Sequence, residues 1–288
     1  MEDFVQAPAA AAMFVLADRA GIDADGLADP ATAVALATTA IDELTPWNGA
    51  EPAAGVRGRA LTLALPLRDL IAAVVTDPRN AWWSAPLDRS AQLLLSDRVV
   101  DPMNLTAPTG PLSRWEVYAQ KPEQGIRTST ELPVSPGAPI RSGAHAELVC
   151  GSRDWSPSYP LHQIRLHVSP RARVYEIGSP ADWHALARRY GDLATHPGPD
   201  TNLLSSGGID HGLAPTWSAV ARDWEGMHLS LAGLLTTLFV PLTTDRVTTT
   251  LWSWESECTH WLRPAFTAST LLPDLIEEPE DPDLHRQW

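Results

Sequence analysis

The chain has 288 residues, of which 44% are hydrophobic and 19% are charged, a balance typical of a globular protein rather than a disordered one. Its formal net charge is −14, which argues against nucleic acid as a partner because phosphate binding needs a basic surface. No apolar run approaches the roughly 18 residues that a membrane-spanning helix needs, so we expect no membrane partner either.

The first third of the chain is predicted to be mainly helical. Residues 8–20 begin with a proline, which is tolerated in a first turn, and they continue as an apolar helix. Asp29 is placed to cap a second helix over residues 30–44, which again starts with proline. Residues 56–65 fit either a short strand or the lead-in to a helix, and residues 66–75 fit a compact helix.

Charged residues at both ends of the apolar N-terminal run argue against a secretory signal peptide, since Asp18 and Arg19 end the run early. Glu2 and Asp3 stand where such a peptide carries basic residues.

The cysteines, Cys150 and Cys258, are too few and too far apart for a disulfide scaffold or a closely spaced zinc site. We therefore expect a cytoplasmic protein with buried free thiols and no metal.

After a Pro- and Thr-rich stretch at 101–111 the pattern changes to short strands. This change divides the chain into a mainly helical region (1–110), a strand-rich α+β region (111–272) and an acidic, Pro-rich tail (273–288). We predict an α+β fold in which a helical N-terminal third precedes an antiparallel, strand-rich domain with one or two helices. The strands are expected at 91–95, 115–119, 126–132, 144–150, 162–168, 173–177 and 248–262.

Two further segments of the strand-rich region stand out. Ser179 and Pro180 are a good helix start, with Asp182 three residues after the cap, and they predict a helix that continues to Tyr190. Residues 191–215 are rich in Gly, Ser and Asp, and a loop of that length in a compact domain usually has a function or is disordered.

The segment 248–262, TTTLWSWESECTHWL, is the strongest strand signal and carries a pair of acids. If it is one strand, Glu255 and Glu257 share a face, roughly 7 Å apart, because side chains alternate along a strand. Trp252 and Trp254 then lie on the opposite face. Two acids held so close either line a site or lie in water.

These motifs resemble those of the ADP-ribosyltransferase superfamily. The likeness rests on an arginine, a Ser/Thr-rich strand and a later Glu-x-Glu strand, in that order, over residues 110–266. The resemblance implies that NAD is the substrate. It also implies that the Ser/Thr strand shapes the nicotinamide pocket, and that the second Glu stabilises the positive charge that develops as the nicotinamide bond breaks.

Carried over to this sequence, Glu257 is the catalytic acid and Glu255 its helper, and residues 128–130 form the pocket strand. Ser129 is central in that strand, between Thr128 and Thr130. Arg114 is the arginine that would bind the diphosphate, with Arg57 and Arg59 as competing candidates. The chain departs from the family pattern in two ways: the strand reads Thr-Ser-Thr rather than Ser-Thr-Ser, and Arg114 lies unusually close to it.

Three other functions remain open at this stage. A carboxylate such as Glu257 also stabilises the oxocarbenium-like state of glycosidic bond cleavage, so a carboxylate-pair hydrolase is one alternative. The 12 tryptophans and the acidic surface are also typical of a non-catalytic module that binds a ligand or a protein. His211, His228 and His260 are available for a metal, but they show no recognised spacing.

Overall fold

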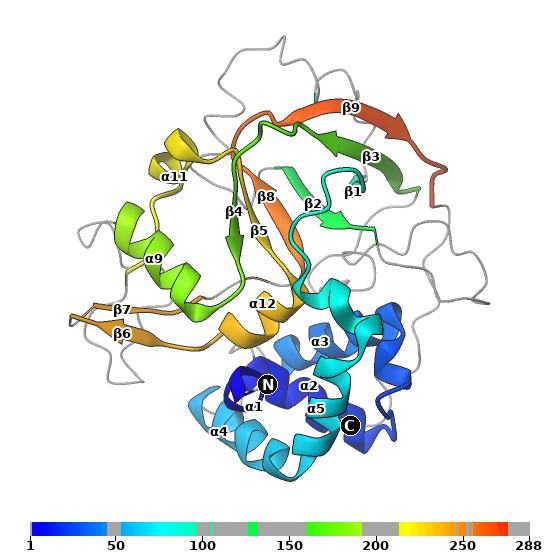
Figure 1. Ribbon diagram of the computed structural model, residues 1–288, viewed down its shortest axis with the longest axis vertical. Helices are drawn as coiled ribbons and strands as arrows, with labels where there is room; N and C mark the ends of the chain where they lie inside the picture. The colour runs from blue at the N-terminus through cyan, green and yellow to red at the C-terminus, as the bar shows by residue number, and fades with distance from the viewer. Residues whose placement is uncertain are drawn as a thin grey trace.

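The computed structural model describes residues 2–44, 53–96, 105, 126–131, 160–191, 213–245, 247–251, 254 and 256–275. Over these ranges it shows helices followed by a curled, mostly antiparallel sheet, so the predicted α+β class is confirmed (Figure 1). The predicted strands at 115–119 and 144–150, and most of the loop at 191–215, lie outside the described residues. None of the described helices combines the length and the apolar character that a membrane crossing requires.

The N-terminal part is a layer of helices packed around one almost fully buried helix. That helix, α2 (Pro8–Arg19), is alanine-rich, and small side chains let neighbouring helices approach it closely. The predicted helices at 8–20 and 30–44 are confirmed, and the segment 56–65 is helical. The other elements of this layer are α1 (Glu2–Gln6), η1 (Gly26–Ala28), α3 (Pro30–Leu44), α4 (Ala53–Ala64), η3 (Leu65–Leu67), α5 (Arg68–Thr76) and η4 (Pro78–Ser84).

The main sheet has seven strands in the order β4-β5-β8-β2-β1-β3-β9. Only β4 and β5 are parallel; every other neighbouring pair is antiparallel. The segments 126–130 and 92–96, far apart in the chain, become direct neighbours near the centre of the sheet. The strands are β1 (Gln92–Ser96), β2 (Ile126–Thr130), β3 (His162–Val168), β4 (Val174–Ile177), β5 (Gly226–Leu229), β8 (Cys258–Trp261) and β9 (Phe266–Leu271).

The predicted single strand at 248–262 is wrong. Its first residues form β7 (Val247–Thr249), which pairs with β6 (Leu242–Thr244) in a separate two-stranded sheet, whereas its last residues form β8 of the main sheet. Between them the chain passes from one sheet to the other, with an isolated bridge at Leu251. High strand propensity marks residues that fit a pleated surface, but it does not say which sheet they join.

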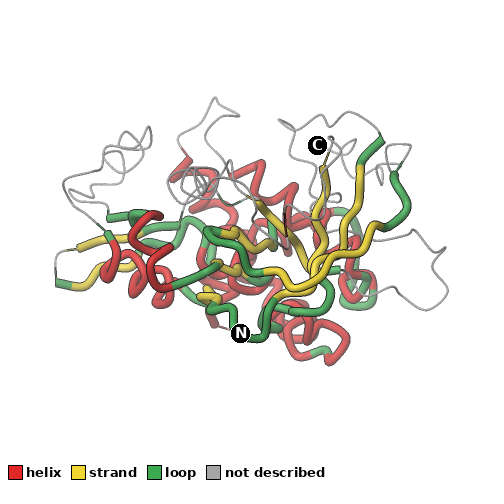
Figure 2. Tube along the Cα trace, turned by 90° about the horizontal axis from the view of Figure 1, so that it is seen from above, coloured by secondary structure: helices red, strands yellow, loops and turns green. Residues whose placement is uncertain are grey.

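Within the described ranges, three helices flank the main sheet: α9 (Pro180–Tyr190), α11 (Trp217–Asp223) and α12 (Leu231–Thr237). The predicted start of α9 is confirmed, since the Ser179 hydroxyl accepts a hydrogen bond from the Asp182 N–H. In Figure 1, α9 and α11 lie beside β4, and α12 lies between the sheet and the N-terminal helices. Seen from above in Figure 2, the strands curve across the molecule instead of forming a flat layer.

The two faces of the sheet have different surroundings. Ile177, Met227 and Leu229 project from β4 and β5 into a large core shared with α12 and the N-terminal helices. The residues between them in sequence face the opposite way, because side chains alternate along a strand. That opposite face carries a second, smaller apolar cluster, which includes Ile164, Trp261 and Phe266, and it carries the polar residues described next.

Candidate functional site

A row of polar side chains crosses one face of the main sheet from β4 to β2. Residues directly opposite each other in neighbouring strands project from the same face. Glu176 of β4 is opposite His228 of β5, and His228 is opposite Thr259 of β8. Thr259 is in turn opposite Thr128 of β2. The strand register therefore places these four polar side chains in one line.

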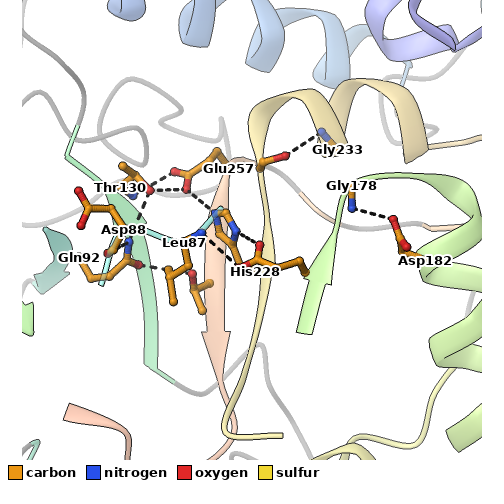
Figure 3. A network of polar contacts seen from close by, with 12 residues as sticks. Leu87, Asp88, Gln92, Thr130, Gly178, Asp182, His228, Gly233 and Glu257 are labelled. Atoms are coloured by element: carbon orange, nitrogen blue, oxygen red, sulfur yellow. Dashed lines mark hydrogen bonds and ion pairs between the residues drawn. The ribbon is translucent and has the colours of Figure 1, made fainter. Parts of the chain in front are cut away.

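Glu257 joins this row from the bend immediately before β8. Its side chain is only 4% exposed, so its charge needs partners. The Thr130 hydroxyl donates to Oε1 at 2.9 Å, and the Thr130 backbone N–H donates to Oε2 at 3.1 Å. Nε2 of His228 lies 3.2 Å from the same Oε1. Figure 3 shows the carboxylate of Glu257 between these two residues.

His228 lies between two carboxylates and is itself 2% exposed. Its Nδ1 is 2.5 Å from Oε2 of Glu176, and its Nε2 faces Glu257. An ionised carboxylate only accepts hydrogen bonds, so if both carboxylates are ionised, both ring nitrogens donate and the ring is an imidazolium. Burial alone would lower the pKa of His228, but the hydrogen bonds and charges of Glu176 and Glu257 outweigh burial and raise the pKa to about 9.

Glu176 connects this buried pair to the surface. Its side chain is 44% exposed, and it lies on β4 at the edge of the sheet. Its second oxygen, Oε1, accepts a hydrogen bond from the backbone N–H of Leu87 at 3.2 Å. Glu176, His228 and Glu257 thus form a continuous hydrogen-bonded line from solvent to the interior.

On the other side of Glu257, a buried network holds the strand β2 in place. The Thr128 hydroxyl donates to Oε1 of Gln92 at 2.6 Å and accepts from the indole N–H of Trp261 at 2.9 Å. Gln92 also donates to the carbonyl of Asp88. Gln92 and Thr128 are completely buried. Because their polar atoms are satisfied, this network fixes β2, and with it Thr130, against β1 and β8.

The structure brings together three of the residues that the sequence singled out. Thr128, Thr130 and Glu257 lie on the same face of adjoining strands, and Thr130 contacts Glu257 directly. Ser129 is buried but projects from the opposite face of β2, because its position alternates with those two threonines. Glu255 and Arg114 lie outside the described residues, so their predicted roles stay predictions.

The competing arginines, Arg57 and Arg59, belong to α4 and not to the sheet. The guanidinium of Arg57 lies over the ring of Phe239, 4.3 Å from its centroid, and burial lowers the pKa of Arg57 to about 10. Arg59 is exposed on the same helix. Helix α4 belongs to the helical layer, and α12 lies between this layer and the strands of the main sheet (Figure 1).

Sequence reasoning missed Glu176 and Gln92 altogether and considered His228 only as a metal ligand. Glu176 and His228 are 52 residues apart and meet through the parallel pairing of β4 with β5. A buried-strand pattern with one histidine, GMHL, was the available signal at β5. Among the described residues, no group of three or more His, Cys, Asp or Glu side chains is placed to hold a metal ion.

Comparisons with protein-family models, with curated proteins and with solved structures found no match for this chain.

Proposed function

We propose that this protein cleaves the bond between nicotinamide and ribose in NAD, as an ADP-ribosyltransferase or an NAD glycohydrolase, with Glu257 as the catalytic carboxylate. One observation carries the proposal: the Ser/Thr strand and the Glu257 segment, 127 residues apart, adjoin in the sheet and meet through the Thr130–Glu257 hydrogen bonds. The resemblance to ADP-ribosyltransferases requires this meeting, and nothing in the local sequence enforces it. A cytoplasmic location is part of the same proposal.

The chemistry of the bond explains why a buried carboxylate is useful. When the C–N bond breaks, its electron pair leaves with the ring nitrogen and gives neutral nicotinamide, and the ribose becomes an oxocarbenium-like cation. A fixed anion in a site of low dielectric stabilises that cation more than water does. Water or another nucleophile then adds to the anomeric carbon and loses a proton, which completes hydrolysis or transfer.

The hydrogen bonds of Glu257 in this structure do not use all of its acceptor positions. Two carboxylate oxygens offer about four acceptor positions. The described residues fill three of them, two from Thr130 and one from His228. In this proposal the fourth position accepts from a ribose hydroxyl, which reaches it past Thr130, the partly exposed partner of Glu257.

The two rival functions receive less support from this geometry. In a carboxylate-pair hydrolase the two acids flank the bond that breaks. Here the ring of His228 occupies the space between Glu257 and Glu176. Glu255 and Glu257 projecting into bulk solvent, far from Ser129, would have favoured a purely binding module; of the two, Glu257 is among the described residues. Instead Glu257 is 4% exposed and contacts the residue next to Ser129 in the chain.

A nicotinamide-release assay tests the proposal. The purified protein is incubated with NAD, alone and with cell extract as a source of acceptors, and free nicotinamide is measured. The Glu257→Gln variant keeps the size of the side chain but loses its charge and one of its two acceptor oxygens. We expect the wild type to release nicotinamide and this variant to do so about 100-fold more slowly, as for other losses of transition-state stabilisation.

Glu225→Gln is the matched control. Glu225 is also a poorly exposed glutamate in ion pairs, with Arg173 and Arg263, but it lies at the far end of β5 from the polar row. Its substitution should leave the rate of nicotinamide release within about twofold of the wild type. No release by the wild type under either condition, or equal rates for wild type and Glu257→Gln, would show that the proposed function is wrong.

A further inference from the structure

We propose that His228 is the positioning residue of this site: paired with Glu176 through one ring nitrogen, it holds the carboxylate of Glu257 in place through the other. This proposal rests on the proposed function and assigns a role to two residues that the resemblance does not include. His228 acts through Glu257 and is not itself required to touch the substrate.

The arrangement solves a problem that any buried catalytic carboxylate has. Removing an ionised carboxylate from water is costly, and an unpaired one takes up a proton instead. A protonated Glu257 could not stabilise a cation. The imidazolium of His228 removes this difficulty, since it supplies a positive charge and a hydrogen bond to Oε1 of Glu257.

Glu176 is what makes the imidazolium stable. Buried histidine favours its neutral form, because burial penalises the charged one. Glu176 and Glu257 are the charged groups of the described residues that act on His228, and Thr259, opposite it on β8, is neutral. With both carboxylates present, the pKa of His228 rises to about 9, so the ring stays charged at neutral pH. With one of them neutral, the pKa should fall.

This dependence separates a positioning role from a merely structural one. Glu176 is 44% exposed, so its substitution creates no cavity, and it lies on the side of the His228 ring away from Glu257. A Glu176→Gln variant therefore changes the charge of His228 without removing any group that contacts Glu257. If His228 only filled space, this variant would behave like the wild type.

The test is the pH dependence of nicotinamide release, measured from pH 5.5 to 9.5 for the wild type and for Glu176→Gln. We expect the wild-type kcat to fall above about pH 9 as His228 loses its proton. In Glu176→Gln the same fall should begin about one pH unit lower or more, which is the usual effect of removing a nearby opposite charge. KM for NAD should change by less than about twofold, because Glu176 does not contact the carboxylate oxygens of Glu257.

A second pair of variants checks that the effect belongs to this histidine. His228→Gln should lower kcat about tenfold or more and abolish the alkaline fall. His184→Gln is the control: His184 is also buried, but its two ring nitrogens contact the hydroxyls of Thr249 and Thr244 and no carboxylate. It should retain the wild-type pH profile and kcat within about twofold.

The protonation state of His228 can also be measured directly, without an activity assay. In protein labelled with ¹⁵N-histidine, the His228 ring should be mostly doubly protonated at pH 8 in the wild type, and about half or less of it should be so at that pH in Glu176→Gln. No turnover by the wild type at any pH would overturn the proposed function and this proposal with it. Turnover with an alkaline fall that does not move in Glu176→Gln, or a His228 ring that is neutral at pH 8 in the active wild type, would overturn the positioning role alone.

Discussion

At the scale of single residues, the site depends on how the chain satisfies one buried charge. Glu257 receives two of its three described hydrogen bonds from Thr130, one from the backbone and one from the hydroxyl. The backbone bond survives any substitution except proline. The hydrogen bond from the Thr130 hydroxyl is lost when the new residue has no hydroxyl group. A hydrogen bond to a charged group contributes about 1.5–3 kcal/mol to stability.

Substitution of Thr130 by valine should therefore weaken catalysis without dismantling the site. Valine has the shape of threonine but lacks the hydroxyl, so we expect nicotinamide release to fall about tenfold in Thr130→Val. Thr130→Ser keeps the hydroxyl and should stay within about threefold of the wild type. Steady-state assays of the two variants make the comparison, and a loss of equal size in both would mean that the hydroxyl is not the important group.

At the scale of elements, helix α12 connects the sheet to the N-terminal helices. Its glycine, Gly233, has no space for a side chain: an added Cβ would lie 2.2 Å from the carbonyl oxygen of Ile177 and 3.2 Å from the Cα of Gly178. The helix therefore packs directly on the end of β4, the strand that carries Glu176. This close approach sets the distance between the sheet and the helical layer.

Gly233→Ala should consequently destabilise the fold by about 2 kcal/mol or more, because backbone atoms rather than flexible side chains would have to move. Gly58→Ala is the control. Gly58 lies inside helix α4 with nothing within 4 Å of an added Cβ, so alanine there should stabilise by about 0.5–1 kcal/mol through helix propensity. Urea unfolding measures both effects, and similar midpoints for the two variants would contradict this packing.

The helices and strands differ in how far the sequence predicts them. The sequence predicts the first residues of the helices that follow Asp29 and Ser179, because capping is a local interaction. Each of these side chains accepts a hydrogen bond from a backbone N–H three residues later. The strand at 248–262 was misread because the exchange of sheets near Leu251 is decided by distant partners. The link between Glu176 and His228 was not visible for a related reason, since it arises from a parallel pairing across helices α9 and α11.

At the scale of the whole molecule, the Glu176–His228–Glu257 line couples global stability to pH. The pKa of His228 is raised from 6.5 to about 9 in the folded protein, so the folded state binds this proton more tightly than the unfolded chain does. The resulting stabilisation is complete below about pH 6.5 and is lost as the pH rises through about 9. Its size is on the order of 3 kcal/mol.

Urea unfolding at pH 6.5 and at pH 9.5 should reveal this coupling. The free energy of unfolding of the wild type should fall between these two pH values, and His228→Gln should show a clearly smaller fall. Staying below pH 10 limits the contribution of Tyr175 and Tyr190, because burial raises the pKa of both phenols. Parallel behaviour of wild type and His228→Gln would mean that His228 is not charged in the folded protein.

We propose that Glu257 is the carboxylate that meets the ribose of NAD. A crystal structure of the Glu257→Gln variant soaked with NAD tests this claim most directly, because the slow variant preserves the substrate. We predict that the side chain at position 257 lies at hydrogen-bond distance, about 3 Å, from a hydroxyl of the nicotinamide ribose, with Thr130 beside it. NAD bound elsewhere on the protein, with position 257 still sealed between Thr130 and His228, would contradict the account.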